Sequence, residues 1–286
     1  QALSEGSETL TADVSDLAGN AAATVTSASF TVDRTATISA IATSALSWGD
    51  YLNATEDNSD GTVSVTTSGV EDGQAVTITL NSQTYTANVS TNAATVTITA
   101  AGLQALSEGS ETLTADVSDL AGNAAATVTS ASFTVDRTAP TAFTVGSVIT
   151  TGGTVVANYW NVTNTGIDIT VPLDNDASLT GGTLQIRANV AGVGFVNLGS
   201  AHTILVGELN ADKTLSFNAA TFEGLTIANL EVTTFTAIIT DKAGNVTTGT
   251  QSTTTITFDE TAPTITSVAP SASSFVKVAD IGYTLS

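Results

Sequence analysis

The chain has no cysteine and no methionine, and only 6 of its 286 residues are Lys or Arg. Without cysteine, a disulfide scaffold, a thiolate metal site and a catalytic thiol are all excluded. The lack of oxidisable sulfur suits a protein exposed outside the cell. No run of 18 or more apolar residues occurs, so the sequence predicts no membrane-spanning helix and no direct membrane insertion of this segment.

The scarcity of basic residues makes the chain strongly acidic. It holds 27 Asp and Glu residues, for a formal net charge of -21. The acidity disfavours nucleic acid as a partner, because phosphate binding needs clustered Lys and Arg. It disfavours an anionic membrane surface for the same reason. Two interpretations of the acidity stay open: it serves solubility, or the carboxylates bind divalent cations.

Groups suited to catalysis are also scarce. His202 is the one histidine, so a Ser-His-Asp triad would depend on that ring, and no G-x-S-x-G motif accompanies it. Its neighbours predict a strand, and we interpret it as an edge or exposed residue. The glycine-rich stretches match no phosphate-binding loop. We predict that the chain is not an enzyme; a glycoside hydrolase with paired carboxylates is a distant alternative.

What the chain does contain is a long internal repeat. Residues 1–36 recur letter for letter as residues 104–139, which gives a period of 103 residues. Solenoid repeats run to about 20–50 residues, whereas a period of about 100 residues is the size of a whole domain. The sequence therefore predicts a tandem array of domains, and an array suggests length or valency and not one chemical reaction.

Alternating polar and apolar residues dominate the chain. Thr, Val and Ile carry this pattern, and they fit the pleated, half-buried surface of a β-sheet. Turn residues separate the stretches at intervals of roughly 8–12 residues, which is typical of a β-sandwich. Residues 101–107 predict one short helical turn. The alternating stretches are 62–67, 76–80, 95–99, 183–187 and 253–258.

A recurring phrase marks the domain borders. Phe-Thr-Val-Asp-Arg-Thr-Ala occupies 30–36 and 133–139, and the looser Ile-Thr-Phe-Asp-Glu-Thr-Ala occupies 256–262. Proline follows the second and third copies, as befits a strand end. We predict four pieces joined by linkers of a few residues, and we expect the segment to be internal to a larger protein. The pieces are the end of one domain (1–36), two complete domains (37–139 and 140–260, the latter divergent) and the start of another (261–286).

A second phrase, Asp-x-Ala-Gly-Asn, begins at Asp16, Asp119 and Asp241. Followed by an apolar strand and D-x-T-A-P, it resembles the bacterial immunoglobulin-like tandem repeats of giant, RTX-type repetitive surface adhesins. The segments 46–54 and 70–74 are similar to repeats of the same class. The resemblance covers nearly the whole chain. It implies tandem immunoglobulin-like antiparallel β-sandwiches arranged end to end, an extracellular place on a bacterial cell surface, and domains stiffened by calcium.

A calcium site between domains can also be argued from the residues. Calcium takes 6–8 oxygen ligands from carboxylates and carbonyls. In a seven-stranded sandwich, the loops before the last strand and after the second strand lie at the end where the chain enters. We therefore expect Asp119 and Asn123, with Glu71 and Asp72, to face Asp33. By the same geometry Asp136 should meet Asp174, Asp176, Asp241 and Asn245, and Asp259 ends the third phrase in the same way.

Each of these features has a plainer interpretation. The Asp and Asn of the phrase can cap a turn by hydrogen bonds while Gly takes a positive φ. The acidic cluster around Asp57 lacks the spacing of an EF-hand, and we interpret it as a solvated loop. Trp48 and Trp160 precede the second strand of their domains, which favours core residues over glycan contacts.

We therefore predict a structural extender, a calcium-stiffened rod of domains that projects a distal binding domain of a large adhesin and functions in cell adhesion or biofilm formation. Its expected partners are neighbouring domains of the same chain. Two alternatives stay open: a segment of a self-assembling surface layer, sheath or filament whose copies pack together, and a glycan- or protein-binding module.

Overall fold

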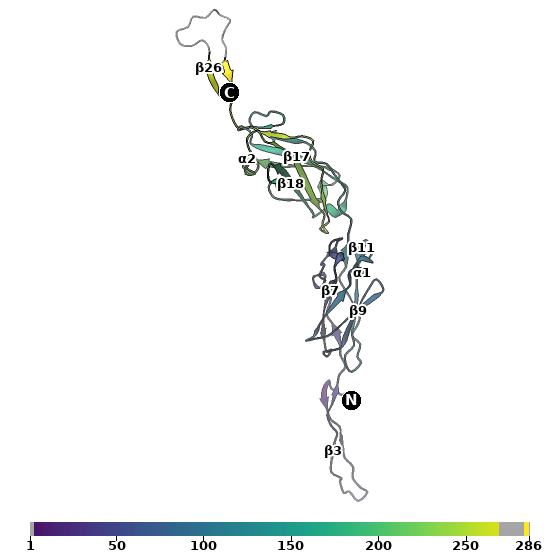
Figure 1. The fold of residues 1–286 in the computed structure, drawn as a ribbon. Coiled ribbons are helices and arrows are strands. Elements are labelled where there is room, and N and C mark those ends of the chain that lie inside the picture. The colour runs from purple at the N-terminus through teal and green to yellow at the C-terminus, as the bar shows by residue number, and fades with distance from the viewer. Residues whose placement is uncertain (1–2, 269–282, 286) are drawn as a thin grey trace, which may run out of the picture. The chain divides into compact units, whose positions relative to one another are not determined.

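The chain divides into two compact units, Gln1–Thr138 and Ala139–Ser286. The computed structural model describes residues 3–268 and 283–285 (Figure 1). Strands make up almost all of its regular structure, with two helices of five residues each. No described helix is long and apolar enough to cross a membrane.

Residues 37–138 of the first unit form a sandwich of three small sheets. Their strand orders are β10-β7-β5, β13-β12-β8-β9 and β11-β14-β6. Pairing is antiparallel except between β14 and β6. The strands are β5 (Thr37–Ile38), β6 (Tyr51–Leu52), β7 (Gly61–Ser68), β8 (Ala75–Leu80), β9 (Gln83–Asn88), β10 (Ala93–Ile98), β11 (Gly109–Glu111), β12 (Thr114–Asp116), β13 (Val128–Thr129) and β14 (Phe133–Val135), with η1 (Thr43–Ala45), η2 (Glu56–Asn58) and α1 (Ala100–Gln104) between them.

The alternation of the sequence sets which side chains enter this core. Val63 and Val65 of β7 are buried, as are Val76 and Ile78 of β8, while their neighbours point outward. A two-residue turn at Asn81 and Ser82, both with positive φ, joins β8 to β9. The predicted strands 62–67, 76–80 and 95–99 are thus found in place, and the predicted helical turn is α1.

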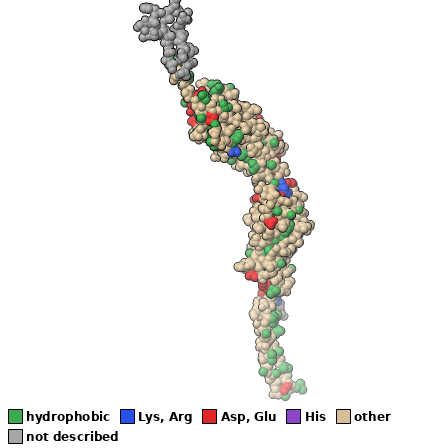
Figure 2. All heavy atoms as spheres, in the orientation of Figure 1, with side chains coloured by type: hydrophobic (Ala, Val, Ile, Leu, Met, Phe, Trp, Pro, Cys, Tyr) green, Lys and Arg blue, Asp and Glu red, His purple; other side chains and the backbone are tan. Residues whose placement is uncertain are grey.

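Residues 3–34 form a narrow hairpin in the same unit. Its strands pair in two short sheets, β1 (Gly6–Glu8) with β4 (Phe30–Val32), and β2 (Thr11–Ala12) with β3 (Val25–Thr26). Figure 2 shows hydrophobic side chains along the surface of this hairpin. In this hairpin Leu10, Val14 and Val25 are 58%, 68% and 67% exposed.

The second unit contains another sandwich, with sheet orders β15-β17-β21, β16-β25-β22 and β19-β18-β23-β24, the last joined by β20 on β18. Only β16 and β25 pair in parallel between named strands. The strands are β15 (Val148–Thr151), β16 (Tyr159–Trp160), β17 (Gly166–Leu173), β18 (Thr183–Val190), β19 (Gly194–Asn197), β20 (His202–Thr203), β21 (Ala211–Asn218), β22 (Val232–Thr233), β23 (Phe235–Thr240), β24 (Val246–Thr248) and β25 (Ile256–Phe258), with η3 (Ala177–Leu179), η4 (Val206–Glu208) and α2 (Ala219–Glu223).

The predicted start of a further domain, 261–286, lies partly outside the described residues. Within it, β26 (Ile265–Val268) pairs with β27 (Tyr283–Leu285). Of the predicted strand 253–258, only the second half is a strand, β25. The four-piece division therefore stays a prediction.

Aromatic rings pack against one another in each core. Trp48 is 6% exposed and contacts Phe133 edge-on, with ring centroids 5.4 Å apart. Trp160 is fully buried and contacts Phe222 at 4.9 Å. These tryptophans are core residues, and a glycan contact through either indole face is excluded by their burial.

The aromatic cluster of the second unit predicts a large effect for Phe222→Ala. Phe222 is fully buried, so its removal should cost about 3–5 kcal/mol. In scanning calorimetry, the transition of the second unit should fall by more than about 10 °C, while that of the first unit stays in place. The control is Val193→Ala at a residue 71% exposed. Equal shifts for the two variants would contradict this assignment of the core.

Candidate functional site

The Asp-x-Ala-Gly-Asn phrase forms the same closed turn wherever it occurs. One carboxylate oxygen of the Asp accepts the backbone N–H of the Asn, and the other accepts its side-chain amide; for Asp119 and Asn123 both distances are 2.7 Å. The glycine before the Asn takes a φ of +89° to +95° in the three copies. The turn therefore forms from local hydrogen bonds alone, as the plainer interpretation expected. The matching pairs are Asp16 with Asn20 and Asp241 with Asn245.

The environment of this turn differs between copies. Asp119 and Asp241 are each 3% exposed, whereas Asp16 is exposed. Desolvation by burial would raise the pKa of Asp119, but hydrogen bonds from the Asn123 side chain and from three backbone amides outweigh it and lower the pKa below 3.8. The Asp119 turn thus carries a full negative charge at neutral pH.

In the first unit, the turn meets the end of the preceding repeat. The side-chain amide of Asn123 donates to the backbone carbonyl of Asp33 at 3.0 Å. The backbone N–H of Leu120, inside the same turn, donates to the Glu71 carboxylate at 2.8 Å. The structure therefore brings together Asp33, Glu71, Asp119 and Asn123, four of the residues predicted to meet.

Asp72 takes part differently. Its carboxylate accepts the backbone N–H of Thr91 at 2.7 Å and so holds the turn between β9 and β10. Asn92 of this turn lines the same hollow as Glu71, so the loop lies at the same end of the domain. Asp72 supports this end of the sandwich, and nothing in the geometry ties it to Asp33.

We call the meeting of Asp33 with Glu71, Asp119 and Asn123 the joint. A hollow of about 340 Å³ lies beside it, and one residue that lines this hollow was not predicted from the sequence. Glu5, Asp33 and Glu71 line it. Glu5 also accepts a hydrogen bond from the Thr35 hydroxyl at 3.0 Å. The hairpin register reveals this residue, because pairing Gly6 with Val32 places Glu5 opposite Asp33, and the sequence alone does not give that register.

The joint contains the types of oxygen ligand that a hard cation binds, but too few acidic side chains converge there to hold one by themselves. Its groups are carboxylates and backbone carbonyls, the ligands that calcium prefers. Among the described residues, however, no three Asp, Glu, His or Cys side chains converge closely enough to hold a metal. A calcium ion would need further oxygen ligands from the backbone or from water at Asp33 and Glu71.

The second unit repeats part of this arrangement. The backbone N–H of Lys242, inside the Asp241 turn, donates to the carbonyl of Ser178 at 2.9 Å. Asp176 caps η3 by accepting the Ser178 backbone N–H at 2.9 Å. The Asp241 turn and the Asp176 loop therefore lie side by side in this domain. The meeting of Asp136 with these residues stays a prediction.

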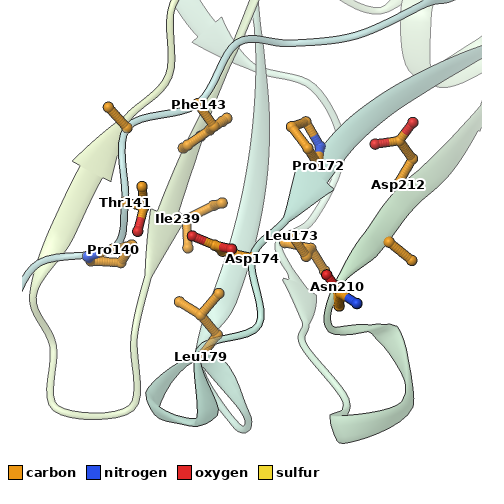
Figure 3. Close-up of a pocket in the computed structure, with 12 residues that line it drawn as sticks. Pro140, Thr141, Phe143, Pro172, Leu173, Asp174, Leu179, Asn210, Asp212 and Ile239 are labelled. Carbon is orange, nitrogen blue, oxygen red and sulfur yellow. The ribbon is translucent and has the colours of Figure 1, made fainter.

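Asp174 lines a pocket of about 320 Å³ in the second unit (Figure 3). The pocket is mixed in character, since Asp212 and Asn210 line it together with apolar side chains. Figure 3 shows Asp174 near Ile239 and Leu173, away from the Asp212 carboxylate. The apolar lining includes Pro140, Phe143, Pro172, Leu173, Leu179 and Ile239.

The aspartates that end each repeat phrase form short turns of their own. The carboxylates of Asp33, Asp136 and Asp259 accept the backbone N–H two residues later, at 3.4, 3.1 and 3.1 Å. This contact explains the spacing of Asp and Thr in the phrase, because an Asp side chain closes such a turn onto the second following amide. Each carboxylate is thereby held at the start of a linker.

The residue after this aspartate anchors the linker to its domain, which the sequence reasoning did not foresee. Arg137 pairs with the buried Asp57 at 2.5 Å and donates to the carbonyls of Leu103 and Leu106. The acidic cluster around Asp57 is therefore more than a solvated loop. In the second unit the equivalent Glu260 accepts the indole N–H of Trp160 at 3.3 Å.

His202 lies on the short strand β20, as its neighbours predicted. It contacts Glu208 at 2.8 Å, and Lys213 also donates to that carboxylate. Burial opposes the charge of Glu208, but Lys213 and His202 outweigh it and lower its pKa to about 2. The three side chains form a small hydrogen-bonded network centred on the Glu208 carboxylate.

Comparison with known proteins shows which solved structures these domains are similar to. No model of a known protein family matches the chain, and neither does any curated protein sequence. Among solved structures, a bacterial immunoglobulin-like domain from the M. primoryensis ice-binding adhesin is 30% identical. The match covers 97% of that domain and 36% of this chain, with a TM-score of 0.26.

The chain belongs to the bacterial immunoglobulin-like domain family. The strand-rich structure with its antiparallel sheets confirms the predicted all-β, immunoglobulin-like fold class.

Two longer structures are also similar to the chain. A Ca2+-stabilized adhesin with which an Antarctic bacterium binds ice is 22% identical, with a TM-score of 0.41, over 91% of this chain and 59% of that one. A 1.5-MDa bacterial ice-binding adhesin is 20% identical, with a TM-score of 0.40, over 82% of this chain and 68% of that one. The chain thus spans less than two thirds of the first structure.

The buried turn of this immunoglobulin-like domain predicts a pH-dependent effect of Asp119→Asn. Because the folded-state pKa of Asp119 is lowered, its stabilising effect is present above the ordinary value of 3.8 and is lost as the pH falls through the folded pKa. The variant should be less stable than the native chain at pH 7, and the difference should shrink below pH 3.8. Denaturant unfolding at both pH values measures it. An equal difference at both would show that the charge of Asp119 has no part in the turn.

Alanine substitutions at two glycines of the loop between β7 and β8 should affect the joint differently. Gly69 and Gly73 both have positive φ, so alanine should cost about 1–2 kcal/mol at either for backbone strain. A Cβ on Gly69 would also lie 2.1 Å from the carbonyl oxygen of Thr35, whereas one on Gly73 meets nothing within 4 Å. Gly69→Ala should therefore speed amide exchange in residues 33–38, and Gly73→Ala should not. Equal exchange in both variants would contradict the close contact.

Proposed function

We propose that this chain is an extender segment of a large bacterial cell-surface adhesin, with a mechanical rather than a catalytic role. The observation that carries the proposal is the hydrogen bond from Asn123 to the backbone of Asp33. It links a turn inside one repeat to the residue that directly follows the last strand, β4, of the previous repeat. Because this contact involves the backbone of the linker, it restrains bending at the joint.

The repeat supports the same conclusion. The sequence that ends at Asp33 and Arg34 ends again at Asp136 and Arg137, so each copy carries both the turn and the strand end of a joint. We propose that the second unit receives Asp136 as the first receives Asp33, beside Asp174, Asp176, Asp241 and Asn245. A chain built this way extends by repetition, and the proposal places it outside the cell with neighbouring domains as partners.

The second part of the proposal is that calcium binds in the hollow beside the joint. Glu5, Asp33 and Glu71 line one hollow without a basic residue among its lining. A divalent cation there would relieve the repulsion between the carboxylates and draw the two sides of the joint together. Bound at a hundredfold excess over its Kd, it would stabilise the docked joint by about 2.7 kcal/mol.

The test combines calorimetric titration of calcium with small-angle scattering of the whole chain, with and without a chelator. We expect calcium to bind and the chelator to broaden the distribution of chain dimensions. Glu71→Gln should weaken binding by about tenfold, because it removes one charged ligand. The control Glu223→Gln makes the same charge change on the exposed face of α2 and should leave binding unaltered.

The outcomes separate the two parts of the proposal. Absence of calcium binding, with extended dimensions in both conditions, would remove calcium and leave the extender. Compact, collapsed dimensions in both conditions would contradict the extender itself.

A further inference from the structure

The two identical 36-residue segments offer a comparison at constant sequence. Both fold into the same hairpin: Gly6 pairs with Val32 as Gly109 pairs with Val135, and Thr11 pairs with Thr26 as Thr114 pairs with Thr129. A side-chain contact recurs as well, since the backbone N–H of Leu10 donates to Ser27 at 2.9 Å and that of Leu113 to Ser130 at 3.1 Å. The local structure of the hairpin is therefore complete without any partner.

What differs is the burial of its apolar face. Leu10 is 58% exposed and its counterpart Leu113 is 1% exposed. Val14 and Val117 are 68% and 4% exposed, and Leu3 and Leu106 are 42% and 4% exposed. Leu17 and Leu120 are exposed in both copies, so the difference is confined to one face.

Residues 37–103 cover that face in the second copy. Strand β8 pairs with β12, and β6 pairs with β14, so this segment supplies a strand neighbour on each side of the hairpin. The equivalent β2 and β4 of the first copy lie in two-stranded sheets, with those edges unpaired in the described part of the chain. Exposed apolar residues beside open strand edges form a surface that accepts added strands.

We propose that the hairpin 3–34 is a preformed docking surface for a second copy of the segment 37–103. The occupant follows from sequence identity, because a face of identical sequence in this chain already binds that segment. The two would form a complete immunoglobulin-like domain with the core that Leu113, Val117 and Phe133 occupy in the first unit. Asp119, unlike exposed Asp16, lies in a turn that contacts both Glu71 of the segment 37–103 and Asp33 of the preceding repeat.

The test extends the full chain by a duplicate of residues 37–103 placed directly before Gln1, which recreates the native junction between Leu103 and Gln104. Amide exchange is followed by mass spectrometry. Because peptides from the two copies have the same mass, Ser4→Thr and Ser29→Thr mark the first copy. These serines and their counterparts Ser107 and Ser132 are exposed.

We expect exchange in residues 6–32 of the extended chain to slow on the order of a thousandfold, to the level of residues 109–135. In the chain without the duplicate, residues 6–32 should exchange much faster than residues 109–135. If the duplicate leaves the exchange of residues 6–32 unchanged, the proposal is wrong.

A matched pair of substitutions tests the face itself. Leu10→Asp should abolish the gain in the extended chain, and should leave the exchange of residues 104–138 unaltered with or without the duplicate. Leu113→Asp should instead expose residues 37–138, which shows that the substitution disrupts a complete domain. Dimerisation of the chain through Leu10 without the duplicate, with no slowing on its addition, would identify a second hairpin as the occupant and overturn the proposal. These readouts require no calcium, so they stand apart from the test of the joint.

Discussion

The structure depends on one constraint, that half of a β-sandwich cannot bury its own apolar face. The hairpin of 36 residues forms its internal hydrogen bonds in both of its copies, yet only the copy beside residues 37–103 removes Leu113 and Val117 from water. Burying an aliphatic side chain of this size contributes about 1.5–3 kcal/mol, and an isolated two-stranded hairpin is marginally stable at best. Strand pairing alone thus defines the local shape, whereas the packing of the two halves supplies the stability of a domain.

The joint between repeats also needs both halves of the sandwich. The turn that begins at Asp119 belongs to the second half of the domain, and the loop that carries Glu71 belongs to the first half. They come together only when both halves have folded, and only then is Asn123 held where it reaches the carbonyl of Asp33. Joint and core are therefore coupled: a domain that loses its core also loses its hold on the preceding linker.

Much of this architecture could be predicted from periodicity and repetition. The alternation of residues 62–67 and 76–80 indicated β7 and β8, and the recurring Asp and Asn of the turn indicated a common position in each domain. The contribution of Glu5 could not be seen without a hairpin register. The pairing of Arg137 with Asp57 spans 80 residues, and no local pattern reports a contact of that separation. Composition indicated that carboxylates and amides gather in the turn phrases, but it could not give the distances between them.

The residues after the strand-end aspartates show why some parts of the phrase vary. At one position stand Arg137 and Glu260, opposite in charge, and each is bonded within its own domain. Arg137 donates to a carboxylate and two carbonyls, whereas Glu260 accepts from an indole, so the position requires a polar side chain with a partner nearby and no particular charge. The aspartate before it closes the same turn in all three phrases. Anchoring to the domain is thus a local solution that each sandwich reaches with its own partner, while the turn that starts the linker is common to them. Repeats with divergent cores can therefore follow one another in a single chain, because the shared turn and not the core shapes the start of each linker.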